Sequence, residues 1–146
     1  MQTRAFEARV DACPDDVWAA LTDPEVTRRF FFGLAVDSDW QVGSPIVYRG
    51  QPPHELTGEL VLVAKPNVLM HSLTDGLRSE GDADAVGWVT WTVERHPSGG
   101  STVCVRVEDL EGLGDPEVDQ AWCQVLTRLG AHFDGARERT GQSPSA

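Results

Sequence analysis

The sequence predicts a single two-layer α+β domain, in which an antiparallel sheet of about seven strands packs one face against a long C-terminal helix. Three observations carry this prediction. Between about residues 34 and 108, apolar residues alternate with a period of two, which is typical of strands with one buried face. After residue 115 the apolar spacing becomes three and four, which indicates an amphipathic helix. The 146 residues suit one domain, since domains most often have roughly 100–150 residues.

The N-terminal segment predicts one strand followed by two short helices. Apolar and charged side chains alternate loosely in residues 4–10, as they do in a strand. Residues 14–16 are a proline and two aspartates, which begin a helix because proline fits the first helical position and carboxylates favour the positive end of the helix dipole. Residues 22–25 repeat this signal, so a second helix follows, and Gly33 is expected to end it.

Five breaks divide the segment from residue 34 to 108 into six predicted strands. They contain glycine, proline, asparagine or aspartate and lie at residues 43–45, 51–53, 65–67, 75–76 and 97–100. The clearest hairpin joins residues 88–94 to 102–108, where strict alternation places three apolar side chains of each strand on one face. Residues 78–84 are acidic and small, so they predict a loop tip.

The last part of the chain predicts a helix that can cover the sheet. Residues 115–117 begin it, and an apolar stripe then extends over about five turns at 3.6 residues per turn. The stripe consists of Val118, Trp122, Val125, Leu126, Leu129 and Phe133. We therefore expect residues 1–139 to form one domain and the polar residues 140–146 to form a flexible C-terminal tail.

Charge and composition exclude several classes of function. The chain has 23 acidic and 12 basic residues, a net charge of −11, so its field repels phosphate backbones and anionic lipid headgroups. Three cysteines lie far apart, which suits reduced thiols rather than a disulfide framework or a zinc site. No apolar run approaches the roughly 20 residues of a membrane span. We expect a cytoplasmic protein that neither binds nucleic acid nor inserts into a membrane.

Five short strings resemble one known family. They are Pro14–Pro24, Asp39–Gly43, Gly58–Val61, Gly99–Val103 and Ala121–Leu129. Their order and spacing resemble the activator of heat-shock-protein-90 ATPase homologue family of the START-like superfamily, also called SRPBCC, which includes polyketide cyclases and birch-pollen-allergen-like proteins. The resemblance covers nearly the whole chain.

The resemblance implies a helix-grip fold. A curved antiparallel sheet would wrap around the long C-terminal helix, with two short helices after the first strand and a ligand cavity between sheet and helix. Two departures from the family pattern matter. Cys13 stands where the family favours a serine or threonine cap, which predicts a weaker helix start. Val107 stands where many members carry a histidine, so the cavity would be drier.

Alternation and the resemblance together indicate which side chains line that cavity. The predicted ligand-binding residues are Phe30, Trp40, Tyr48, Leu69, His71, Leu73, Trp91, Val105, Trp122 and Leu126. Each of them also suits an ordinary hydrophobic core, because aromatic side chains at core spacing need no ligand to explain them. His71 and Tyr48 are the polar members, able to donate a hydrogen bond to a ligand or to be satisfied by neighbouring protein groups.

The predicted function is non-catalytic binding of a small hydrophobic or aromatic ligand. Two alternatives remain open. A polyketide cyclase or aromatase would need an acid or base in the pocket, for which only His71, Tyr48 and Glu55 are available. A co-chaperone-like interaction module is the other, since the family name links the chain with chaperones and the stress response. We expect no catalytic set, no metal and no cofactor; pairing as a homodimer stays open.

Overall fold

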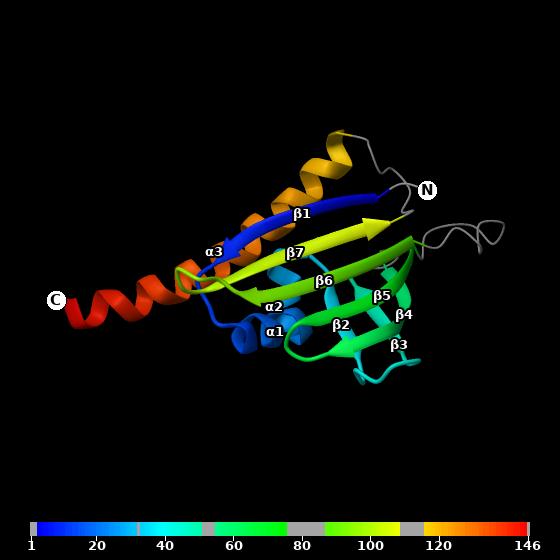
Figure 1. Ribbon diagram of the computed structural model, residues 1–146, viewed down its shortest axis with the longest axis horizontal. Helices are drawn as coiled ribbons and strands as arrows, with labels where there is room; N and C mark the ends of the chain where they lie inside the picture. The colour runs from blue at the N-terminus through cyan, green and yellow to red at the C-terminus, as the bar shows by residue number, and fades with distance from the viewer. Residues whose placement is uncertain (1–2, 32, 51–54, 76–86, 109–115, 146) are drawn as a thin grey trace.

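The computed structural model describes residues 3–31, 33–50, 55–75, 87–108 and 116–145, and these contain seven strands and three helices (Figure 1). Their order along the chain is the one that the sequence predicts. The elements are β1 (Thr3–Val10), α1 (Pro14–Thr22), α2 (Pro24–Phe30), β2 (Ala35–Ser38), β3 (Pro45–Arg49), β4 (Glu55–Ala64), β5 (Val68–Asp75), β6 (Gly87–Arg95), β7 (Ser101–Glu108) and α3 (Pro116–Ser145).

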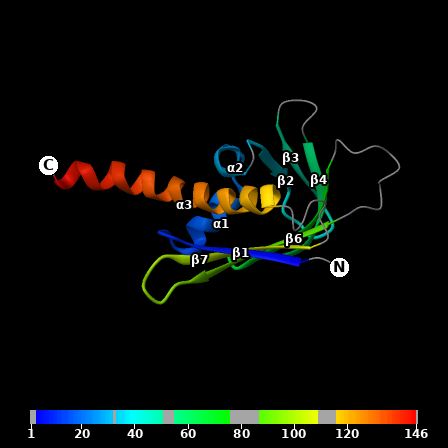
Figure 2. The same ribbon diagram turned by 90° about the horizontal axis from the view of Figure 1, so that it is seen from above.

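The strands form one antiparallel sheet in the order β1-β7-β6-β5-β4-β3-β2. Sequence neighbours are sheet neighbours except for β1, which pairs with β7 and so closes the domain across its two ends. Figure 2 shows the sheet curving around the N-terminal half of α3, with α2 on the same side as α3. The predicted helix-grip architecture is confirmed.

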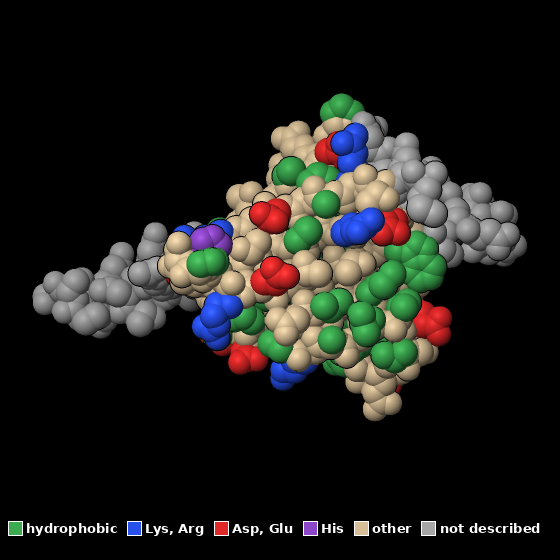
Figure 3. All heavy atoms as spheres, viewed as in Figure 1, with side chains coloured by type: hydrophobic (Ala, Val, Ile, Leu, Met, Phe, Trp, Pro, Cys, Tyr) green, Lys and Arg blue, Asp and Glu red, His purple; other side chains and the backbone are tan. Residues whose placement is uncertain are grey.

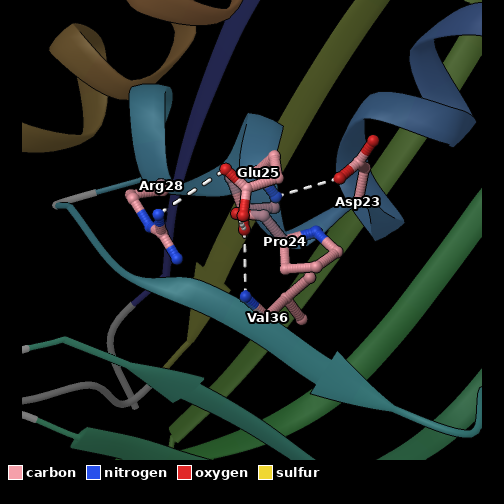
Figure 4. Close-up of polar contacts among 6 residues, drawn as sticks. Asp23, Pro24, Glu25, Arg28 and Val36 are labelled. Atoms are coloured by element: carbon pink, nitrogen blue, oxygen red, sulfur yellow. Dashed lines mark hydrogen bonds and ion pairs between the residues drawn. The ribbon is translucent and has the colours of Figure 1, made fainter.

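The two short helices begin as their sequences predict. At α1 the Cys13 side chain makes no capping hydrogen bond, which matches the weak cap expected of a thiol. At α2 a carboxylate oxygen of Asp23 accepts the backbone N–H of Glu25 at 2.9 Å. The buried Thr27 hydroxyl accepts the N–H of Val36 at 2.9 Å and so ties α2 to β2 (Figure 4). This bond fixes the middle of α2 to β2, the strand at the edge of the sheet.

The core lies between the inner face of the sheet and the three helices. The predicted hairpin of β6 and β7 alternates as expected, and its inward valines are fully buried: Val89, Val93, Val103, Val105 and Val107. The α3 stripe meets them with Trp122, Val125, Leu126 and Leu129 buried and Phe133 partly buried. None of the described helices is long and apolar enough to cross a membrane.

Two regions of the sequence differ from the expectation or lie outside the described part of the chain. The helix α3 continues to Ser145, so the segment from residue 140, which we expected to be a flexible tail, is helical up to Ser145; the domain boundary at residue 139 stays a prediction. The predicted loop tip at residues 78–84 lies outside the described residues, as do the break at 51–53 and the side chain of Val118.

At Gly58 the backbones of β4 and β5 lie too close together for a side chain. A Cβ atom added there would overlap the backbone carbonyl oxygen of Ser72, which cannot swing away as a side chain can. Gly58→Ala should therefore lower the free energy of unfolding by at least about 2 kcal/mol in chemical denaturation. The matched control is Gly130→Ala in α3, whose added Cβ would make an ordinary contact with Val10 at 3.8 Å. That control should gain about 0.5–1 kcal/mol, and equal effects of the two substitutions would contradict the close approach.

Candidate functional site

Aromatic rings from four elements meet where the end of α2 faces the sheet and α3. Phe31 is at their centre, with its ring centroid 4.5 Å from that of Tyr48 on β3 and 5.8 Å from that of Trp122 on α3. Trp91 on β6 lies 6.3 Å away and Phe30 lies 6.5 Å away in edge-to-face arrangements. These five residues are the aromatic cluster. Ring contacts of this geometry are worth about 0.5–1.5 kcal/mol each beyond the area they bury.

One polar pair lies against this cluster. The Tyr48 hydroxyl is 3.4 Å from Nε2 of His71, and both side chains are buried. Nδ1 of His71 is 2.8 Å from the carbonyl oxygen of Ser72. Because a carbonyl only accepts, Nδ1 carries the proton, and Nε2 is left to accept from the Tyr48 hydroxyl. At 3.4 Å this second bond is long, so the hydroxyl is weakly bonded where it lies.

Burial keeps both members of the pair uncharged. Loss of hydration lowers the pKa of His71 from 6.5 to about 4, against the opposing effect of the Ser72 hydrogen bond. Burial likewise raises the pKa of the Tyr48 phenol. At neutral pH the pair therefore offers hydrogen bonds without charge. Acid–base catalysis works best with a pKa near the working pH, so this chemistry favours binding over proton transfer.

The structure brings together nine of the ten predicted site residues. Each of the nine is at most 4% exposed: Phe30, Tyr48, Leu69, His71, Leu73, Trp91, Val105, Trp122 and Leu126. They lie on β3, β5, β6, β7, α2 and α3, facing the space between sheet and helix. Their burial suits a ligand site and a hydrophobic core alike, so their role in binding stays a prediction.

Trp40, the tenth predicted residue, packs against the core but is only partly buried. It is half-buried in the turn before β3 and lines an open groove of about 630 Å³ together with Trp18, Val63 and Lys65. Its φ is +63°, a left-handed conformation that costs a large side chain about 1–3 kcal/mol. The Ser38 hydroxyl, which accepts the Trp40 N–H at 3.1 Å, supports this backbone.

Phe31 is the central ring that the predicted site lacks. In a regular helix only one of two consecutive residues points straight at the core, and the sequence pattern favoured Phe30. The structure ends α2 at Phe30, and Phe31 leaves helical geometry with φ −112° and ψ 79°. Both side chains are then 1% exposed. The run of phenylalanines at residues 30–32 was the only signal in the sequence for this arrangement.

The remaining polar side chains give no second cluster in the part of the chain that the structure describes. Among those residues, no group of three or more His, Cys, Asp or Glu side chains is placed to hold a metal ion. His96 accepts the backbone N–H of Ser98 in the turn between β6 and β7, and His132 packs its ring against Phe133 on α3. Glu55, the third acid–base candidate, has a side chain outside the described set.

His71 predicts a pH dependence of stability. Its pKa is lower in the folded protein than the 6.5 of a free side chain, so the unfolded state binds more protons between about pH 6.5 and pH 4. Stability should be constant above this window and fall as pH drops through it, by roughly 3 kcal/mol in total. Urea denaturation at a series of pH values measures the fall. In His71→Phe the fall should be smaller by that amount, and an unchanged pH profile would contradict a buried neutral imidazole.

Comparisons with known proteins place these observations in a family context. The sequence profile described as "Activator of Hsp90 ATPase homolog 1-like protein" matches residues 11–134. That range contains both short helices, strands β2 to β7 and the part of α3 that packs on the sheet. The comparison with curated proteins gives no significant match.

Solved structures share the fold at low sequence identity. ChR145 from Cytophaga hutchinsonii is 22% identical with a TM-score of 0.77, over 94% of this chain and 97% of that one. DynU16, a protein of the dynemicin biosynthetic locus, is 20% identical with a TM-score of 0.74, over 92% of this chain and 48% of that one. The Aha1 dimer from Colwellia psychrerythraea is 14% identical with a TM-score of 0.72, over 91% and 96%. At these identities the likeness shows the fold alone.

Proposed function

The chain belongs to the activator of Hsp90 ATPase homolog 1-like family, and from this premise we propose that it binds one small hydrophobic or aromatic molecule between the sheet and α3. The binding is non-catalytic and takes place in the cytoplasm. The cysteines Cys13, Cys104 and Cys123 are free thiols, which supports the proposal of a reducing compartment such as the cytoplasm.

The Tyr48–His71 pair is the observation that carries this proposal. A core built only for stability gains little from a buried phenol and imidazole whose mutual bond is as long as 3.4 Å. A ligand carbonyl or hydroxyl that accepts from the Tyr48 hydroxyl at a shorter distance would improve that bonding. The apolar walls around the pair would exclude water, which strengthens a hydrogen bond. Ligand sites commonly combine apolar walls with a few such polar groups.

Phe31 is the ring that we expect to move when the ligand enters. It contacts Tyr48 more closely than any other ring contact described in the cluster, at 4.5 Å. Unlike the rings on β3 and β6, it lies outside any helix or strand, directly after the end of a seven-residue helix. Gly33, with φ +75°, lies two residues further along and can absorb a change of direction. Displacement of this ring would expose the polar pair to a ligand of similar size.

Native mass spectrometry of the purified protein tests the proposal directly. A mass excess that disappears on denaturation is expected if a ligand copurifies, and the released mass gives its class. Loss of the excess in Phe31→Trp, which enlarges the ring in the proposed site, would assign the ligand to this site. A bound chaperone in place of a small molecule would instead support the interaction-module alternative.

A matched pair of probes tests the role of Tyr48. We expect 2-acetylnaphthalene, which has a carbonyl, to bind about fivefold more tightly than 2-ethylnaphthalene, because one hydrogen bond is worth about 1 kcal/mol. In Tyr48→Phe, which keeps the ring, the two probes should bind equally. Quenching of tryptophan fluorescence measures both affinities, since Trp91 and Trp122 lie in the cluster.

The control for this test is Tyr48→Phe with 2-ethylnaphthalene, whose affinity should not change because it makes no hydrogen bond. Absence of binding by either probe, together with a native mass equal to the mass of the chain, would contradict the proposed function. An equal preference for the carbonyl probe in the wild type and in Tyr48→Phe would remove the phenol from the site.

A further inference from the structure

Strand β4 has an open edge beyond the end of β3. The pairing of β3 with β4 ends at Pro45 and Glu59, whereas β4 continues to Ala64. The turn before β3 also pairs with Leu60 of β4. The N–H of Gly43 donates to the Leu60 carbonyl oxygen at 2.8 Å, and the N–H of Leu60 donates to the Ser44 carbonyl oxygen at 2.9 Å. Among the described residues, 62–64 then have strand partners on β5 only, and Val61 lies at the shift in register between β4 and β5.

The open groove runs along this same edge. One side of the groove is formed by Val63 on β4 and by Lys65 directly after β4. Its aromatic walls are Trp18 on α1 and Trp40. An edge that ends beside a concave aromatic surface offers backbone hydrogen bonds and a side-chain pocket together. These are the two components of recognition by strand addition.

Exposed apolar side chains border the edge on its other side. The large hydrophobic side chains that are exposed in the described part of the chain are Val42, Val61 and Leu62, at 63%, 41% and 45%. Val61 and Leu62 belong to the open edge, where the register of β4 against β5 shifts between Leu60 and Leu62. Figure 3 shows apolar side chains gathered over the outer face of the sheet where β4 and β5 lie in Figure 1. Long apolar edges are usually protected in proteins that do not use them.

We propose that the β4 edge, residues 61–64, binds an extended segment of a partner protein as an additional strand. Alternate side chains of that segment face the groove and the exposed apolar surface, so the segment carries a large apolar residue for the groove. The charge of the chain, −11, selects a basic segment. Asp23 and Lys65 are the charged residues that line the groove, and Asp39 directly precedes Trp40 in the sequence.

Two other occupants fit less well. A second copy would bring a second net charge of −11 to the edge, which opposes association of two copies. A small molecule in the groove would leave Val42 and Leu62 exposed. An extended peptide satisfies the edge, the groove and the exposed side chains together.

A phage-displayed library of random peptides about 12 residues long tests this inference, with selection on the wild type and counter-selection on Trp40→Gly. Glycine adopts the φ of +63° at this position freely, so the turn keeps its shape while the aromatic wall is lost. We expect enriched peptides with a large apolar residue flanked by lysine or arginine. Their affinity should fall at least about tenfold in Trp40→Gly and severalfold at high salt.

Two further measurements separate strand addition from other modes. Trp88→Ala, which removes a half-buried tryptophan from β6 away from the groove, should bind the peptides as the wild type does. Within residues 61–64, the backbone N–H groups that face the open edge should exchange at least about tenfold more slowly when peptide is added, because those groups gain partners. Val61→Glu, at an exposed position, should weaken binding with no change in folding.

Several outcomes would overturn the inference. They are a selection that enriches no peptide family, peptides that bind Trp40→Gly and Val61→Glu as tightly as the wild type, or bound peptides that leave exchange at residues 61–64 unchanged. A dimer in light scattering that Val61→Glu converts to a monomer would assign the edge to a second copy instead. None of these outcomes depends on a ligand in the aromatic cluster, so the two proposals are tested independently.

Discussion

The apolar inner face of the curved sheet has to be covered, and one helix covers most of it. Burial of apolar area supplies about 25 cal/mol per Å², and the fully buried valines of β6 and β7 share one core cluster with Trp122, Leu126 and Leu129 of α3. A single straight helix cannot follow a seven-stranded curved surface along its whole width. The short helices α1 and α2 cover the remainder, with α1 contacting β6 and α2 contacting β2. The Thr27–Val36 hydrogen bond holds α2 at this edge of the sheet. The aromatic cluster forms where these coverings meet.

A polar pair in this location has consequences for both stability and binding. Tyr48 and His71 come from β3 and β5, on either side of β4, and their side chains meet beneath Phe31 rather than at the protein surface. The imidazole is held neutral there because burial lowers its pKa to about 4. The same desolvation that makes protonation costly makes any hydrogen bond to the phenol stronger. Stability and ligand affinity therefore depend on one property of the site, its exclusion of water.

The sequence predicted the order, type and inward faces of the elements because those features follow from local periodicity and local turn chemistry. Nine of the ten predicted site residues are buried together for that reason. Phe31 and Trp40 mark the limit of such reasoning. Phe31 turns inward because α2 ends one residue earlier, and Trp40 adopts φ +63° because Ser38 and the neighbouring strands hold the turn. The irregularity of β4 between Leu60 and Leu62 also depends on pairing with β5, which no local pattern encodes.

That irregularity lets one strand take part in two surfaces. Leu60 is 1% exposed in the core, whereas Val61 and Leu62, directly after it, are exposed at the edge. A regular strand would return every second side chain to the core and would leave less apolar surface beside the groove. Trp18 also connects the core with the groove, because its side chain is buried in the core and also lines the groove. The helix α2 is shared as well, because Pro24 lines the groove and Phe30 and Phe31 lie at the other end of this helix. Coupling between the regions would therefore pass through the Trp18 ring, α2 or β4. A ligand that moves the Phe31 ring without moving Trp18 or α2 would leave the β4 edge unchanged, so the two proposed sites function independently unless α1 or α2 shifts.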